Sequence, residues 1–183
     1  LGGQPLAEQL AGGILGPLGL ASTTFGDSSA IVAGRGPWYS RLDLSGPVPR
    51  LAERVHATWV AYPKVAAPCA GLNATALDLA RFVDAVAERR LLAPATVDAM
   101  WRPQTLRDGT PAGMDPTTGM GLGWIVEVAD GRVLVGGSGG ATAAVRHEVA
   151  GGLTVAVLTN CQGSDPDGLA TAIVGCLPDA DPA

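Results

Sequence analysis

Residues 122–159 carry the pattern that most constrains how this chain folds. Four runs rich in Val, Leu, Ile and Ala cover 122–128, 133–136, 143–149 and 153–159, and short glycine-bearing turns are expected at 129–132 and 151–152. The second and third runs are interpreted as one strand that continues through the glycines, over 133–149. The pattern therefore predicts three consecutive strands in an antiparallel meander.

A helix is expected directly after these strands, over 166–177. Asp165 can cap it, and Pro166 suits its first position. Its apolar positions share one face, which consists of Leu169, Ile173, Cys176 and Leu177. The strands and this helix need each other to bury their apolar faces. We therefore expect Leu169, Ile173 and Leu177 to pack on the sheet, and Cys176 to be buried.

The first 120 residues have a different character. Helical periodicity appears at 5–15, at 75–91 and at 94–101. The stretches 16–70 and 102–120 are rich in Gly, Pro and polar residues, and they are expected to be irregular. We expect a helical and loop region over 1–120 and a sheet region over 121–183. Both would belong to the C-terminal part of one domain.

The overall composition excludes several classes of function. A net charge of −5 without a basic cluster argues against nucleic-acid binding. No apolar run approaches the roughly 20 residues of a membrane span, and no residues have the spacing of a metal site or of a phosphate loop. No cofactor is expected. The chain opens without an initiator Met or a signal-peptide pattern, so we expect any targeting sequence to lie upstream.

The run 136–140, Gly-Gly-Ser-Gly-Gly, matches the Gly-x-Ser-x-Gly pattern of a nucleophile elbow. An elbow needs a helix after the serine, and an acid and then a histidine further along the chain. Here a strand-like run follows Ser138, His56 precedes it, and His147 comes only nine residues later. The glycines instead favour a strand that another backbone or a ligand approaches closely.

That strand carries a family resemblance. Residues 135–145 read Val-Gly-Gly-Ser-Gly-Gly-Ala-Thr-Ala-Ala-Val, and 153–160 read Leu-Thr-Val-Ala-Val-Leu-Thr-Asn. The pair resembles the serine β-lactamases and their esterase and peptidase relatives, in which a Lys/His-Ser/Thr-Gly triplet lines the active site and a partner strand ends in Leu-Thr-Asn. Residues 16–25 are similar to the family's Pro-Leu-Gly-Met…Thr-x-Phe stretch. Residues 70–82 look like its Gly-Gly-Leu-x-Ser-Thr-Ala-x-Asp-Leu-Ala-Arg-Phe helix start.

Three such segments in the family's order identify the chain as resembling the C-terminal portion of a serine β-lactamase or penicillin-binding-protein-like hydrolase (class C β-lactamase, DD-peptidase and esterase relatives). The resemblance implies an α/β (α+β) fold of the β-lactamase/transpeptidase type, with an antiparallel sheet flanked by helices. It implies acyl transfer to serine from an ester, peptide or β-lactam, followed by hydrolysis. The substrate is expected to be a small molecule or a peptide. Members are often extracytoplasmic, but this sequence does not indicate a compartment.

Two motifs of the family are absent from the sequence. The nucleophile's Ser-x-x-Lys cannot be formed, because Lys64 is the single lysine and Ala61 stands three residues before it. Tyr-x-Asn and Ser-x-Asn are also missing, since Tyr39 and Tyr62 are followed two residues on by Arg41 and Lys64, and no Ser-x-Asn occurs. Both motifs would precede this chain in the family. We therefore expect the chain to be inactive alone, and to need a missing N-terminal segment or a partner chain to complete its sheet.

The third motif is present in altered form. The triplet aligns with Gly137, Ser138 and Gly139, so a glycine replaces the usual cation. The resemblance implies that Gly137–Gly140 bind substrate and border a cleft, and that the Gly140 backbone N–H forms half of an oxyanion hole. The loss of the cation keeps a second interpretation open, a non-catalytic binding descendant of the same fold. His147 and Glu148 are expected to form a surface pair, and His56 to lie in a solvated loop.

Overall fold

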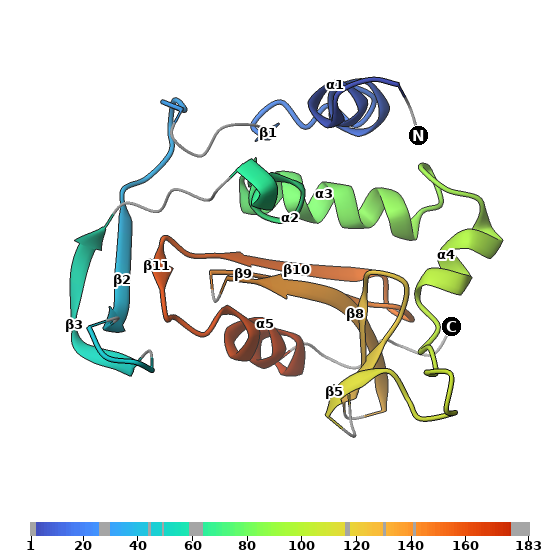
Figure 1. Ribbon diagram of the computed structural model, residues 1–183. Coiled ribbons are helices and arrows are strands. Elements are labelled where there is room, and N and C mark those ends of the chain that lie inside the picture. Colours follow the sequence, from blue (N-terminus) through green and yellow to red (C-terminus); the bar gives the residue numbers. More distant parts are fainter. Residues whose placement is uncertain are drawn as a thin grey trace.

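The computed structural model describes residues 3–25, 30–43, 45–48, 50–58, 64–115, 118–129, 131–140 and 142–176. A central sheet lies between two layers of helices, and a smaller strand assembly stands at one end of it (Figure 1). No helix among the described residues is long and apolar enough to cross a membrane.

The central sheet has six strands, all antiparallel to their neighbours, in the order β10-β9-β8-β7-β6-β5. The strands are β5 (Gly113–Asp115), β6 (Thr118–Met120), β7 (Ile125–Ala129), β8 (Arg132–Gly139), β9 (Ala143–Glu148) and β10 (Leu153–Leu158). The expectation of consecutive antiparallel strands is confirmed. The interpretation of 133–149 as one strand was wrong, because the chain reverses after Gly139 and β9 pairs back onto β8.

Two helices cover one face of the sheet. In α3 (Ala76–Ala87), the Thr75 hydroxyl caps the helix by accepting a hydrogen bond from the backbone N–H of Asp78. The following helix is α4 (Pro94–Met100). Their apolar side chains share one buried cluster with those of the sheet, which consists of Val83, Val86, Val97, Trp124, Val126, Val135 and Val145. This cluster is the main core of the described structure.

The last helix, α5 (Pro166–Gly175), covers the opposite face and begins at the predicted cap, Asp165. The predicted packing face was wrong. Ala170 and Val174 are buried, whereas Leu169 and Ile173 are 52% and 38% exposed. The small side chain of Ala170 lets the helix approach Ala144 and Val157 closely, and this turns the larger residues outward. Cys176 is exposed rather than buried, and Leu177 lies outside the described residues.

Two of the segments that carried the resemblance pack together. The helix α1 (Leu6–Leu10) continues as a π-helical segment over Ala11–Leu15, and β1 (Thr24–Phe25) then pairs with β4 (Leu72–Asn73). The buried carboxylate of Asp78 accepts hydrogen bonds from the Ser22 N–H and the Thr23 hydroxyl, each 3.0 Å long. A carboxylate with these donors anchors the N-terminal segment to the start of α3.

The expectation of irregular chain over 16–70 was wrong for a large part of that stretch. β2 (Trp38–Asp43) and β3 (Arg50–Thr58) form an antiparallel pair, and β11 (Cys161–Gln162) joins β2 in parallel. A short 3-10 turn (Lys64–Ala66) and α2 (Ala67–Ala70) follow. Trp59 and Tyr62, aromatic residues of the same stretch, lie outside the described residues. This second sheet stands beside the end of β10 (Figure 1).

Candidate functional site

Gly137, Ser138 and Gly139 form the end of β8, as expected for the altered triplet. Ser138 is exposed and lies opposite Ala144 of β9. Gly140 follows in the turn with a φ of 60°, and the Thr142 N–H closes the turn onto the Gly139 carbonyl at 3.1 Å. A strand, not a helix, follows the serine. The nucleophile-elbow alternative is therefore excluded.

The neighbouring glycines of β8 have different surroundings. A Cβ atom on Gly136 would collide with the backbone carbonyl of Val145. A Cβ on Gly137 or Gly139 would meet nothing within 4 Å. The left-handed φ of Gly140 disfavours any residue with a side chain. The strand is thus pressed against β9 at Gly136, and its backbone is open along Gly137–Gly139, where a ligand has room to approach.

A buried arginine lies on the neighbouring strand β9, beside this open segment. The side chain of Arg146 in β9 is only 7% exposed, and its Nη2 bonds the Asp167 carboxylate of α5 at 2.7 Å. Its Nε lies 3.5 Å from a carboxylate oxygen of Glu127 in β7. Its Nη1 donates to the carbonyls of Val145, at 3.0 Å, and of Gly137, at 3.4 Å. The guanidinium therefore joins two strands, one helix and the backbone of the triplet.

The expected surface pair of His147 and Glu148 was wrong, because both residues are about 95% buried. His147 Nδ1 lies 2.8 Å from the Thr154 hydroxyl, which donates in turn to the Asp84 carboxylate of α3. The ring also packs on Trp101, with centroids 5.5 Å apart. Burial lowers the pKa of His147, while the carboxylates of Asp84 and Glu148 act in the opposite direction. Glu148 accepts a hydrogen bond from the Gly151 N–H at 2.8 Å and so holds the next turn.

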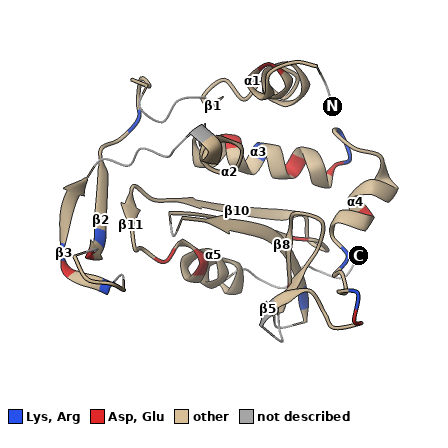
Figure 2. Ribbon diagram, in the orientation of Figure 1, with Lys and Arg blue, Asp and Glu red and all other residues tan. Residues whose placement is uncertain are grey.

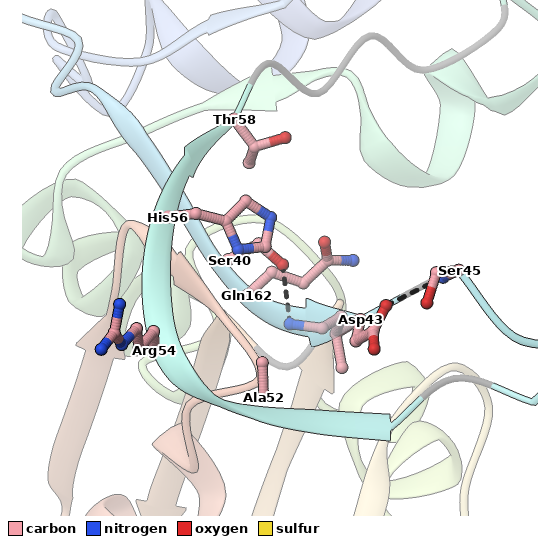
Figure 3. A pocket seen from close by; sticks show the side chains of 9 residues that line it. Ser40, Asp43, Ser45, Ala52, Arg54, His56, Thr58 and Gln162 are labelled. Atoms are coloured by element: carbon pink, nitrogen blue, oxygen red, sulfur yellow. Dashed lines mark hydrogen bonds between the residues drawn. The ribbon is translucent and has the colours of Figure 1, made fainter.

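His56 is exposed, as expected, but lies on β3 rather than in a loop. It borders an open pocket of about 440 Å³ between β2, β3 and the end of β11 (Figure 3). In the close-up, His56, Ser40 and Gln162 lie near one another, and Asp43 lies further along β2. Hydrogen bonds from Ser45 lower the pKa of the Asp43 carboxyl. Gly137–Gly140 do not line this pocket, so the cleft expected beside them stays a prediction.

The pocket and the triplet are nevertheless linked through the end of β10. The Thr159 N–H donates to the Thr142 carbonyl in the turn after Gly140, at 2.7 Å. The next residue, Asn160, accepts from the Tyr39 N–H of β2 at 2.8 Å. Both features therefore lie at the same end of the central sheet. Within the described ranges, no group of three or more His, Cys, Asp or Glu side chains is placed to hold a metal ion.

Sequence reasoning had missed the arginine cluster. Its one visible signal was a charged residue inside the apolar run 143–149, since a charge in a buried strand requires partners. The partners Glu127 and Asp167 lie 19 and 21 positions away in the sequence (146 − 127 and 167 − 146). Local pattern does not indicate such pairs. The three-dimensional fold alone brings them together.

Comparisons with known proteins give one consistent result. The family model described as Beta-lactamase matches residues 1–175. Among solved structures, a D-stereospecific amidohydrolase from Streptomyces sp. is similar, with 22% identity and a TM-score of 0.73 over 98% of this chain and 50% of that one. A penicillin binding protein from Bacillus halodurans is 14% identical, with a TM-score of 0.65 over 93% of this chain and 49% of that one.

A D-amino acid amidase from Ochrobactrum anthropi SV3 is also similar, with 20% identity and a TM-score of 0.63 over 92% of this chain and 47% of its own length. At these identities the structures establish a shared fold. The chain spans about half the length of the solved structures that it matches. No curated protein matches it.

Proposed function

The chain belongs to the β-lactamase family, and from that premise we propose that it forms part of a serine hydrolase acting through an acyl-enzyme. The fold is that of β-lactamase-like serine hydrolases. The proposed substrates are esters, peptides or β-lactams, all of which can transfer an acyl group to a serine hydroxyl. The chain would then be the C-terminal part of one catalytic domain.

One observation carries this proposal, the position of Gly137–Gly140 at the open end of β8. Ser138 is exposed and can donate a hydrogen bond to a bound substrate. In this proposal the backbone N–H of Gly140 stabilises the negative charge that develops on the substrate oxygen. The absence of side-chain contacts around Gly137 and Gly139 leaves room for the substrate backbone to lie along the strand.

The nucleophile is proposed to come from outside residues 1–183. The sequence holds no Ser-x-x-Lys, and the chain corresponds to about half of each matched structure. Among the described residues, β10 pairs only with β9 and leaves its other edge open. We propose that a preceding segment or a partner chain supplies the nucleophile and extends the sheet at this edge.

Ester or peptide hydrolysis is the preferred reaction. The usual cation of the triplet would contribute about 1.5–3 kcal/mol through a charged hydrogen bond to a substrate carboxylate. Gly137 does not provide that bond. Substrates without a carboxylate lose less from its absence, and this favours neutral esters and peptides over β-lactams.

Gly137 also supports a second candidate, a non-catalytic descendant that keeps the fold as a binding module. The two candidates differ in whether a nucleophile acts at Gly137–Gly140. A Ser-x-x-Lys within about the preceding hundred residues would favour the enzyme, because a segment of that length fits within one domain together with this chain.

The test is acylation of the chain alone and of a longer protein that contains it. Residues 1–183 should show no labelling by fluorescent penicillin and no hydrolysis of p-nitrophenyl acetate. The longer protein should hydrolyse p-nitrophenyl acetate, and it should be labelled less readily by fluorescent penicillin, because Gly137 offers no cation to the carboxylate of a β-lactam. A stoichiometric acyl adduct on the isolated chain would contradict the proposal of an external nucleophile. A longer protein that carries Ser-x-x-Lys but reacts with neither reagent would favour the binding module.

A further inference from the structure

We propose that Arg146 is a positioning residue for the Ser138–Gly140 segment. Its buried guanidinium holds the Gly137 carbonyl from the neighbouring strand β9, and Asp167 and Glu127 hold the guanidinium. The catalytic part of this inference rests on the proposed function. The structural part does not, because it concerns only how the backbone of β8 is held.

The strand register explains how one side chain reaches so many partners. Arg146 lies opposite Gly136, on the face of the sheet that also carries Ala144 and α5. Since Gly136 has no side chain, the arginine can extend across β8 towards Glu127 on β7. The same glycine lets β8 press against β9 at Val145. Gly136 and Arg146 therefore form one packing unit directly before the triplet.

The charges exclude a direct role in binding a substrate anion. One guanidinium faces two carboxylates, so the cluster carries no spare positive charge. With 7% of its side chain exposed, Arg146 has little surface to offer a ligand. Its planar group presents donors in fixed directions. The hydrogen bonds of Nη1 and Nη2 go to Asp167, Val145 and Gly137, whereas the buried Nε has no hydrogen-bond partner among the described residues.

The backbone of the triplet needs an additional contact to fix its position, because the residues of the triplet make few side-chain contacts. Nothing would touch a Cβ at Gly137 or Gly139, and Ser138 is exposed. Glycines have wide backbone freedom, and misplacement by about 1 Å can cost two orders of magnitude in rate. The bond from Arg146 to Gly137 links this segment to Asp167, in the first turn of α5, where Figure 2 shows acidic residues in red.

The first arm of the test is amide hydrogen exchange, which needs no activity. In Arg146→Met, exchange at Ser138–Gly140 should rise about tenfold or more relative to Val155–Val157 of β10, because the loss is local. Asp167→Asn changes a partly exposed residue, so the fold should stay intact. The exchange rate of the same segment should rise by a smaller factor. Arg81→Gln, which removes a cation from α3, is the matched control and should leave both segments unchanged.

Arg146→Lys should restore part of the exchange protection that Arg146→Met loses. It restores the charge but lacks the fork that reaches Asp167 and Gly137 together, so exchange should fall between the wild-type and Met values. Equal acceleration in β8 and β10 would show a purely structural role and overturn the inference. No acceleration at Ser138–Gly140 in Asp167→Asn and Arg146→Met would overturn it as well.

The second arm uses a longer protein that is acylated by p-nitrophenyl acetate. Arg146→Met should lower kcat about tenfold or more with KM changed less than about threefold, the signature of an interaction that matters in the transition state. A rise in KM confined to anionic esters would instead make Arg146 a substrate-binding cation and contradict the inference. If the wild-type longer protein is not acylated, the proposed function fails, and the exchange arm still decides the role of Arg146.

Discussion

Gly136 and Gly137 are adjacent in β8, but only one of the two positions requires a glycine for packing. Gly136 is required by contact, because the backbone of Val145 occupies the space of its missing side chain. Gly137 is not required by contact, since the same space is empty there. The packing of the strand therefore does not require a glycine at position 137.

Gly136→Ala and Gly137→Ala should differ sharply in stability. The first forces the methyl group against the Val145 carbonyl and should lower the free energy of unfolding by about 1–3 kcal/mol or more. The second should change it by less than about 0.5 kcal/mol. Urea unfolding followed by circular dichroism measures both. Equal costs would contradict the packing described for β8 and β9.

The open space at Gly137 also accommodates the cation that the triplet lacks. In a longer, acylated protein, Gly137→Lys should improve kcat/KM for carboxylate-bearing substrates about tenfold or more, the value of one charged hydrogen bond. Neutral esters should change little and serve as the control. An equal response of acidic and neutral substrates would count against the alignment of Gly137 with the family's cation.

His147 links stability to pH. The ring is buried among Thr154, Asp84, Glu148 and Trp101, and burial lowers its pKa in the folded state. In the unfolded chain the ring titrates near its ordinary value of about 6.5. Protons therefore bind the unfolded state more readily. Stability is fully present above pH 6.5 and is lost as the pH falls below that value.

This predicts that the free energy of unfolding at pH 5.5 is lower than at pH 7.5, by up to about 1.4 kcal/mol for each pH unit below 6.5. His147→Gln should flatten this part of the profile. His56→Gln, at the exposed histidine of β3, should leave it unchanged. An unaltered slope in His147→Gln would show that other groups cause the pH dependence.

The sequence did not reveal that His147 is buried, for a physical reason. A half-buried strand alternates between exposed and buried positions, and that alternation is the usual signal. In β9, by contrast, helices cover both faces of the sheet, and all residues from Ala144 to Glu148 are buried. Polar residues in such a strand are satisfied by partners far along the chain, and local pattern does not show those partners.

Among the elements, α5 shows what caps predict and what they do not. Asp165 and Pro166 indicated where the helix begins, and it begins there. The packing face was displaced by one position, because Ala170 makes the close contact and the larger Leu169 and Ile173 flank it. Counting the largest apolar residues favoured the wrong face.

A pair of truncations on α5 tests this face. Val174→Ala should cost about 2 kcal/mol in the free energy of unfolding, because it removes two methyl-sized groups from a buried position. Leu169→Ala removes more atoms from a side chain that is 52% exposed and should cost less than about 1 kcal/mol. The reverse order, measured by thermal and urea unfolding, would restore the face predicted from the sequence.

β2 and β3 were missed because their composition hides them. β3 contains Arg50, Glu53, Arg54 and His56, and most of its residues are exposed on both faces of the strand. Because β3 has no buried apolar face, its sequence lacks the alternation of apolar and polar residues that predicts a strand. The sheet of β7–β10 was predictable because its runs are apolar and its turns carry glycine, although the turn inside 136–142 was interpreted as continuous strand.

At the scale of the whole molecule, the described fold is a sheet with helices on both faces and an edge at β10 that is paired on one side only. The chain matches about half of each similar structure. The family and its fold were predictable, because three separated segments appear in the family's order. The contacts around Arg146 were not, because they join three strands and a helix across the sheet.

The central claim is that Gly137–Gly140 serve a nucleophile outside residues 1–183. Its most direct test is to acylate a longer protein that contains this chain and to locate the adduct by peptide mapping and mass spectrometry. We expect one acyl group on a serine of a Ser-x-x-Lys sequence outside residues 1–183, with slower acylation at the same serine in Ser138→Ala. An acyl group on Ser138, or on any other residue of this chain, would contradict it.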